Sequence, residues 1–279
     1  MKTKLIPIVA AVAVVVTAVT APAQTPAAAA PLPIQDNSFL IEEAYNQEWG
    51  VVQHISTFQR VRGAFGWGAT FTQEWPAPSQ RHQLSYTVPI QRSMTVGGAR
   101  TGVGDVALNY RYQVPMAQGS SAAVSPRLSV VIPTGRDEWG HGSGSAGLQL
   151  NLPLSIQLSP WLVSHSNLGG NWTPSARNEV GEEATARGFF VGQSLIWLVH
   201  PKFNLMLESI WSDDESVVGP DRTEWERGFL VSPGVRAAFD LPSGLQIVPG
   251  VAVPIGVGPS DGERGVFVYL SFEHAFRKQ

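Results

Sequence analysis

The sequence GLQLNLPLSIQL, residues 147–158, decides the fold of this chain. Every second residue in it is aliphatic, and the residues between them are glutamine, asparagine, serine and proline. Successive side chains of a β-strand point to opposite faces, so this alternation predicts one apolar face and one polar, uncharged face. A helix would distribute the leucines around its circumference, and Pro153 would interrupt it. The apolar face consists of Leu148, Leu150, Leu152, Leu154, Ile156 and Leu158.

The stretch is long enough to cross a membrane as a strand. At ~3.3 Å per residue and ~45° tilt it rises roughly 25 Å, which is the height of the apolar band of an outer-membrane barrel. Strands of soluble sandwiches usually have about five or six residues. We therefore predict that the leucine face contacts lipid and that the polar face lines the lumen of a barrel. An exported soluble β-sandwich is the competing fold.

The composition agrees with a barrel. Charged residues make up 15% of the 279 residues, below the roughly one quarter that is usual, while the hydrophobic share is an ordinary 43%. A barrel hides its lipid-facing residues by alternation, so its average hydropathy stays near neutral. The net charge of −3 argues against a nucleic-acid partner, and the lack of cysteine excludes disulfides and thiolate metal sites. We expect no cofactor.

The N-terminus predicts export. Two lysines precede an apolar run at residues 5–19, which is short for a membrane helix, and residues 21–23 fit the small-residue cleavage pattern. We predict that residues 1–23 are a cleaved signal peptide; cleavage within residues 27–30, or an uncleaved anchor, is the alternative. No later stretch offers ~18 consecutive apolar residues, so a membrane-embedded form must be a barrel. This indicates the outer membrane of a Gram-negative cell.

The remaining chain divides into two parts. We predict an N-terminal periplasmic leader at residues 24–47 and the barrel at residues 48–279. Within the leader, residues 36–48 are too acidic to lie in lipid, and both a short helix and a periplasmic extension are open.

About twelve strand-like segments follow one another from residue 49, with little room for helix between them. An even number is what single-chain bacterial barrels use. The sequence therefore predicts an all-β fold, an antiparallel transmembrane barrel. The predicted segments are 49–59, 66–74, 83–90, 103–114, 124–132, 147–158, 161–172, 189–199, 203–211, 229–239, 245–255 and 266–276.

The connections between these segments alternate in length. Tight turns are predicted at 159–160, 200–202 and 241–244, and long polar loops at 133–145, 173–188, 212–226 and 256–265. Short turns on one side and long loops on the other are typical of the periplasmic and extracellular sides of such a barrel.

Aromatic residues gather near the ends of the predicted strands. Trp161 and Trp197 fall at periplasmic ends, and Trp172 and Trp211 fall at outer ends. Because indole rings favour the membrane–water interface, we predict that these four tryptophans are interfacial anchors.

Six prolines lie inside the predicted strands. A closed barrel has no free edge at which the missing N–H would be harmless, so we predict bulges or ladder breaks at several of them. They are Pro89, Pro126, Pro153, Pro233, Pro249 and Pro254.

Six charged residues fall on inward positions of separate strands. Charges inside a barrel must pair or face water, so they predict either an ion-pair network or a constriction that selects solutes, and the same residues can form both. Twelve strands lie between the filled eight-stranded and the open sixteen-stranded barrel, so we expect a narrow or partly plugged lumen. The predicted lumen residues are Asp105, Arg111, Arg127, Glu208, Arg236 and Glu273.

Other motifs carry less weight. The GSGSAG at residues 142–147 matches the dinucleotide pattern but lacks its strand–turn–helix context, which favours a flexible loop. Acidic clusters at 137–141 and 213–215 have no fixed ligand spacing, so we expect no metal. Residues 164–166, Ser-His-Ser, are the best local cluster for a lipid-modifying enzyme, but neighbours on a strand point to opposite faces. We expect no catalytic residues and no enzymatic activity.

Several segments resemble the bacterial outer-membrane family labelled MetA-pathway-of-phenol-degradation, or transporter, proteins. The segments are 38–54, 74–89, 101–114, 125–135 and 203–211, of which TGVGD and IPTG are the most specific. The resemblance implies a porin-like barrel for small, hydrophobic or aromatic compounds. The expected function is passive passage of such solutes, and the alternative is a structural or surface-interaction barrel. Expected partners are outer-membrane lipid, a small-molecule solute and the barrel-assembly machinery, with no nucleic acid.

Overall fold

The computed structural model describes residues 38–62, 66–95, 97–117 and 119–275. The predicted signal peptide, residues 1–23, lies outside the described residues, as does the beginning of the predicted leader.

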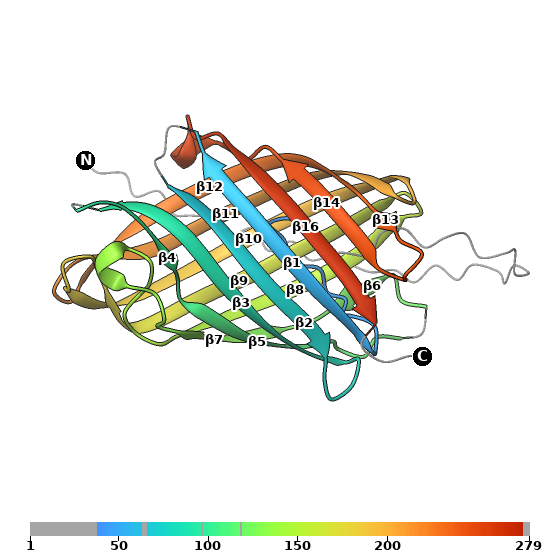
Figure 1. Cartoon of the computed structure of the whole chain (residues 1–279), viewed down its shortest axis with the longest axis horizontal. Helices are drawn as coiled ribbons and strands as arrows, with labels where there is room; N and C mark the ends of the chain where they lie inside the picture. The colour runs from blue at the N-terminus through green and yellow to red at the C-terminus, as the bar shows by residue number, and fades with distance from the viewer. Residues whose placement is uncertain (1–37, 63–65, 96, 118, 276–279) are drawn as a thin grey trace, which may run out of the picture. The chain divides into compact units, whose positions relative to one another are not determined.

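The described residues form a closed antiparallel β-barrel (Figure 1). Sixteen strand segments occur, and four of them continue a neighbouring segment across a short break, so twelve strands span the barrel. Pairing of β12 with β14 closes the sheet, and β16 pairs with β1. The predicted fold class is confirmed.

The segments keep the order of the prediction and differ from it mainly at their ends. They are β1 (Val51–Val61), β2 (Trp67–Pro76), β3 (His82–Thr95), β4 (Gly98–Val103), β5 (Val106–Tyr112), β6 (Ala122–Val124), β7 (Arg127–Ile132), β8 (Gly147–Ser159), β9 (Leu162–Arg177), β10 (Glu183–His200), β11 (Phe203–Gly219), β12 (Arg222–Ala237), β13 (Phe239–Asp240), β14 (Gln246–Ala252), β15 (Ile255–Gly256) and β16 (Gly265–Ala275). Two short 3-10 helices, η1 (Asp137–Trp139) and η2 (Gly258–Ser260), lie between strands. None of the described helices is long and apolar enough to cross a membrane.

The two faces of β8 separate as its alternation predicts. Leu150 is 62% exposed on the outer surface, whereas Asn151 and Ser155 are buried in the interior. The same outward set includes Leu148, Leu152 and Leu158, which are exposed, and Leu154 and Ile156, which are half-buried. Contact of this face with lipid stays a prediction.

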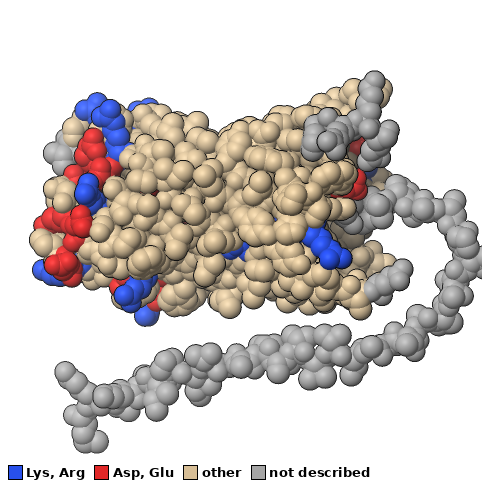
Figure 2. Space-filling view, turned by 90° about the horizontal axis from the view of Figure 1, so that it is seen from below, with Lys and Arg blue, Asp and Glu red and all other residues tan. Residues whose placement is uncertain are grey.

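On the face of the barrel seen in Figure 2, charged residues lie mostly toward the ends. Figure 2 shows Lys, Arg, Asp and Glu gathered toward the two ends, with a broad middle band almost free of them. Exposed ion pairs such as Arg136–Glu138 and Arg177–Glu183 lie among the outer connections. An apolar band between two charged rims is the surface that a bilayer requires of a barrel.

Three breaks in the strand ladder each lie opposite a proline. The break between β4 and β5 faces Pro89, whose carbonyl accepts from Gly104 N–H at 2.8 Å. The other two breaks, at residues 125–126 and 253–254, face Pro153 and Pro233. The predicted ladder breaks are thus confirmed. The presence of Pro153 inside β8 is explained, because its missing N–H coincides with the break between β6 and β7.

The prediction of a long loop is wrong at two of the four positions. Residues 173–188 and 212–226 continue the β9–β10 and β11–β12 hairpins beyond the apolar band, and only short turns remain at 178–182 and 220–221. Cross-strand polar contacts explain this extension, because ion pairs and hydrogen bonds between facing side chains stabilise a ladder in water. Examples are Arg227 to Asp213 at 3.1 Å and Thr223 to Glu215 at 3.0 Å.

Candidate functional site

The residues that precede β1 run through the interior of the barrel. We call residues 38–50 the N-terminal segment. Ile41 and Ala44 are 1% and 0% exposed, and Ser38 Oγ donates to Ser194 Oγ of β10 at 2.8 Å. The sequence predicts a periplasmic leader for residues 38–47, but the structure places them in the lumen.

Side chains of the barrel wall satisfy the backbone of the N-terminal segment. The segment forms neither helix nor strand, so its buried N–H groups need other acceptors. Oxygen atoms from five different strands or their ends supply them. The contacts are Leu40 and Ile41 N–H to Glu208, Glu42 N–H to Asn167, Ala44 N–H to Ser155, Asn46 N–H to Gln113 and Gln47 N–H to Gln83, at 2.7–3.2 Å.

Glu208 of β11 makes the densest of these contacts. One carboxylate oxygen, Oε1, accepts from Leu40 N–H at 2.9 Å and from Ile41 N–H at 3.2 Å. The side chain is 0% exposed, and the buried guanidinium of Arg236 lies close enough to interact with its charge. A buried carboxylate is tolerated only with such partners, so Glu208 is tied to the presence of the segment.

Arg127 of β7 forms an ion pair with Glu42 of the N-terminal segment. Its Nη2 lies 2.8 Å from Glu42 Oε1, and its Nε donates to Oε2 at 3.0 Å. The other donors reach Asn109, Ser129 and Gln149. Each of the three guanidinium nitrogens therefore donates at least one hydrogen bond, in addition to the ion pair.

The last residues of the segment before β1 are held by side chains of β5 and β16. Arg111 of β5 donates to Asn46 Oδ1 at 3.0 Å, to the Glu43 carbonyl at 3.0 Å and to the Tyr45 carbonyl at 2.7 Å. Glu273 of β16 accepts from Gln47 Nε2 at 3.1 Å. These contacts hold the chain where it turns from the lumen into β1.

Apolar side chains of the segment fit spaces left by glycines. The ring of Phe39 stacks on Phe267 at 5.7 Å between centroids. A Cβ at Gly250 would collide with the Phe39 ring, and one at Gly192 would collide with Ile41 Cδ1. Glycine inside a strand often marks such a close approach.

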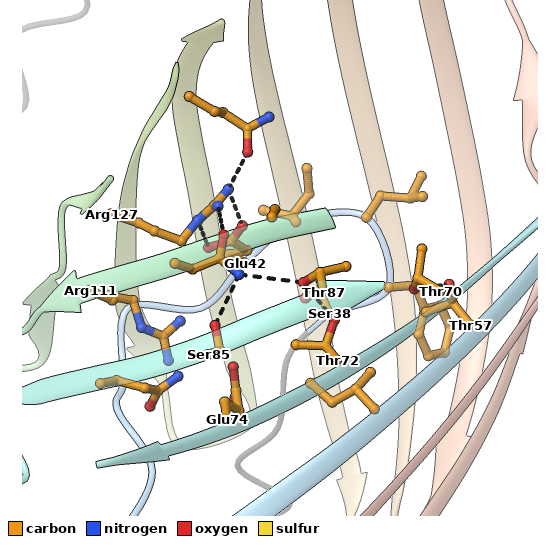
Figure 3. Close-up of a pocket in the computed structure, with 18 of the residues that line it drawn as sticks. Ser38, Glu42, Thr57, Thr70, Thr72, Glu74, Ser85, Thr87, Arg111 and Arg127 are labelled. Carbon is orange, nitrogen blue, oxygen red and sulfur yellow. Dashed lines mark hydrogen bonds and ion pairs between the residues drawn. The ribbon is translucent and has the colours of Figure 1, made fainter. Parts of the chain in front are cut away.

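A cavity of about 320 Å³ remains beside the segment (Figure 3). It is bounded on one side by residues 38–42, and the rest of its lining comes from β1, β2, β3, β5, β7, β8 and β16. The labelled threonines and Ser85 in Figure 3 point into it from the strands. The lumen is therefore narrowed rather than filled.

The loop between β7 and β8 folds back over one end of the barrel. Asp105 accepts from Gly135 N–H at 3.0 Å and Ser143 N–H at 2.7 Å, which folds the loop back. Ser93, on the inner face of β3, is 2.9 Å from His141 Nε2 and donates to the Trp139 carbonyl. The predicted GxGxxG and the acidic residues 137–138 belong to this loop.

The predicted lumen charges thus fall into two groups. Arg111, Arg127, Glu208 and Glu273 contact the N-terminal segment directly, and Arg236 is buried beside Glu208. Asp105 instead braces the outer loop. Sequence reasoning missed Glu42 as the partner of Arg127, and it missed Asn167, Ser155 and Gln83 as acceptors for the backbone of the segment. The inward glycines were the available signal.

The serine–histidine cluster is arranged differently from the sequence expectation. His165 Nδ1 lies 2.6 Å from Ser155 of the neighbouring strand, whereas Ser164 and Ser166 both contact Gln193. Ser155 also accepts from Ala44 N–H. Both members are buried under the N-terminal segment, so the pair is out of reach of membrane lipid. Among the described residues no group of three or more His, Asp or Glu side chains could hold a metal ion.

The four tryptophans lie on different parts of the strands. Trp161 and Trp172 are exposed, and Trp197 and Trp211 are half-buried. Because β9 extends to Arg177 and β11 to Gly219, Trp172 and Trp211 lie within their strands rather than at the outer ends. Trp211 packs edge-on against Phe189 at 5.0 Å between ring centroids, just below the first charged residues of the extended hairpins. Their role as interfacial anchors stays a prediction.

Comparison with solved structures finds the same fold. The COG4313 outer membrane channel from Pseudomonas putida F1 has a TM-score of 0.64 at 13% identity, over 84% of this chain and 98% of that one. The NanC porin has a TM-score of 0.52 at 9% identity, over 78% of this chain and 98% of that one. No protein-family model matches the sequence, and no curated protein does. The class that these findings define is the outer-membrane type of β-barrel.

Proposed function

We propose that the chain is an outer-membrane channel through which small solutes pass passively, with its own N-terminal segment narrowing the lumen. The single observation that carries this proposal is the partly unfilled polar interior behind an apolar outer surface. The two barrels with the same fold are described as a channel and a porin, which supports the same class of function.

Export and insertion belong to the same proposal. A cleaved signal peptide at residues 1–23 would deliver the chain to the periplasm, and the barrel-assembly machinery would insert it into outer-membrane lipid. The sequence resemblance adds small hydrophobic or aromatic compounds as candidate solutes. The cavity lining, however, combines apolar side chains with hydroxyl, amide and charged groups, so its small size is the firmer guide to the solute.

A structural barrel without transport is the second candidate function. It is favoured by one observation, the extensive contact between the N-terminal segment and the wall, which leaves a cavity of only about 320 Å³. Such a barrel would keep the segment in place permanently.

Planar bilayers distinguish the two functions. We expect the intact chain to give small current steps and a variant lacking residues 38–47 to give steps several-fold larger. Heat-modifiable gel mobility shows that the variant has folded. Bilayers that stay silent with both proteins would contradict the channel and favour the structural barrel.

A further inference from the structure

The cavity beside the N-terminal segment carries no net charge. Four charged side chains line it: Glu42, Glu74, Arg111 and Arg127. Two are acidic and two are basic, so their charges cancel. The lining therefore has no excess of either sign with which to attract an ion.

The arginines at the cavity are also committed to other partners. Arg127 forms an ion pair with Glu42 and makes four hydrogen bonds, to Glu42, Asn109, Ser129 and Gln149. Arg111 directs Nε, Nη1 and Nη2 to the N-terminal segment. An ion that enters must lose part of its hydration shell, and guanidinium groups already bonded to Glu42 and to the N-terminal segment have little capacity left to replace it.

Hydroxyl groups form the opposite wall. Thr57 of β1 and Thr70 of β2 lie 2.7 Å apart, and Thr72 of β2 and Thr87 of β3 lie 2.9 Å apart (Figure 3). In each pair one hydroxyl donates to the other, which leaves one O–H and several lone pairs for a solute. Such a wall can both donate to and accept from the hydroxyl groups of a neutral molecule.

The apolar end and the size of the cavity fit the same kind of molecule. Phe39, Ile55 and Tyr269 line one end, where they can contact the C–H groups of a carbon skeleton. A volume of about 320 Å³ is at the lower limit of small-molecule sites, which span roughly 300–1,000 Å³.

We infer that the passage beside the N-terminal segment selects small neutral hydroxylated solutes, polyols and small sugars, over solutes that carry net charge. This inference rests on the proposed channel function. The Thr72–Thr87 pair supplies the hydrogen bonds, and the Glu42–Arg127 pair keeps the lining neutral.

Swelling of liposomes that contain the purified full chain tests the inference. The solutes are glucose, gluconate and glucosamine, which have similar size and differ in charge. We expect glucose to enter several-fold faster than both charged solutes. The Thr72→Val/Thr87→Val double variant should slow glucose several-fold, whereas Thr101→Val, outside the cavity lining, should leave it unchanged. Glu42→Gln should speed gluconate, because it leaves Arg127 without its carboxylate.

The outcomes separate this inference from the channel itself. Entry of gluconate or glucosamine as fast as glucose would overturn the selectivity and leave the channel intact. Exclusion of every solute by the full chain, with entry through the variant lacking residues 38–47, would overturn the passage beside the segment. Exclusion of every solute by both proteins would overturn both the inference and the proposed function.

Discussion

The two walls of the lumen treat the N-terminal segment differently. The wall formed by β8–β11 binds residues 38–44 through Ser155, Asn167, Ser194 and Glu208. The wall formed by β1–β3 faces the same residues across a cavity and offers threonine hydroxyls. We call these the holding wall and the cavity wall. Strong single acceptors fix a backbone in place, whereas paired hydroxyls leave room and spare hydrogen bonds for a solute.

Loss of Glu208 should have the largest effect on the contact between the N-terminal segment and the holding wall. Glu208→Ala leaves Leu40 N–H, Ile41 N–H and the buried Arg236 without their carboxylate. Removal of one partner from a buried charged network costs about 3–5 kcal/mol, which is enough to release the segment. We expect larger current steps and rapid proteolysis near residue 40. Glu208→Gln, which keeps an acceptor oxygen, should change both much less, and equal effects of the two variants would count against the hydrogen bonds as the cause.

A charge on the outer face of the holding wall should damage the barrel without releasing the segment. Leu152→Arg places a guanidinium in the apolar band and should cost roughly 2–4 kcal/mol of barrel stability, measured by urea unfolding in lipid. Thr70→Arg, on the cavity wall, can extend into the cavity and should reduce solute entry with little loss of stability. Similar stability losses in the two variants would show that the faces are not distinct.

Overpacking the space for Phe39 should have a smaller effect. Gly250→Ala drives a methyl group into the Phe39 ring, and overpacking of this kind typically costs about 1–3 kcal/mol. We expect the segment to become more accessible to protease while the barrel stays folded. Gly68→Ala, whose nearest neighbour would be 3.9 Å away, is the matched control. A protected segment in Gly250→Ala would mean that Phe39 does not occupy this space.

The sequence predicts the barrel because each strand carries its own signal. The side to which a residue of β8 points depends only on a period of two, so Leu150 and Asn151 can be assigned without their neighbours. The prolines carry a similar local signal, and the ladder breaks opposite Pro89, Pro153 and Pro233 follow from the missing N–H.

The sequence does not predict the hairpin extensions, because the composition of one strand says nothing about the strand that pairs with it. Residues such as Asp213 and Glu215 look like an exposed loop in composition. Their contacts with Arg227 and Thr223 appear only when the two strands are aligned, because a single strand does not show its cross-strand partners.

The N-terminal segment could not be placed from its own residues. Its contacts depend on partners far away in the chain: Leu40 and Glu208 are separated by 168 positions. The segment has no alternation of its own to decide between helix, leader and lumen. Glycines at the inward positions 192, 234 and 250 were the available hint, because each leaves space for Phe39 or Ile41.

Cross-linking tests the central claim, that the N-terminal segment lies in the lumen against the holding wall. The chain has no cysteine, so a Ser38→Cys/Ser194→Cys variant carries only the designed pair, whose native hydroxyl oxygens lie 2.8 Å apart. We predict a disulfide on mild oxidation of intact outer membranes, seen as a mobility shift that reductant reverses. Ser38→Cys/Ser209→Cys, with the second residue on the outer face of β11, should stay unlinked. Failure of the first pair to link, together with labelling of the thiol introduced at position 38 by a membrane-impermeant maleimide, would contradict the account.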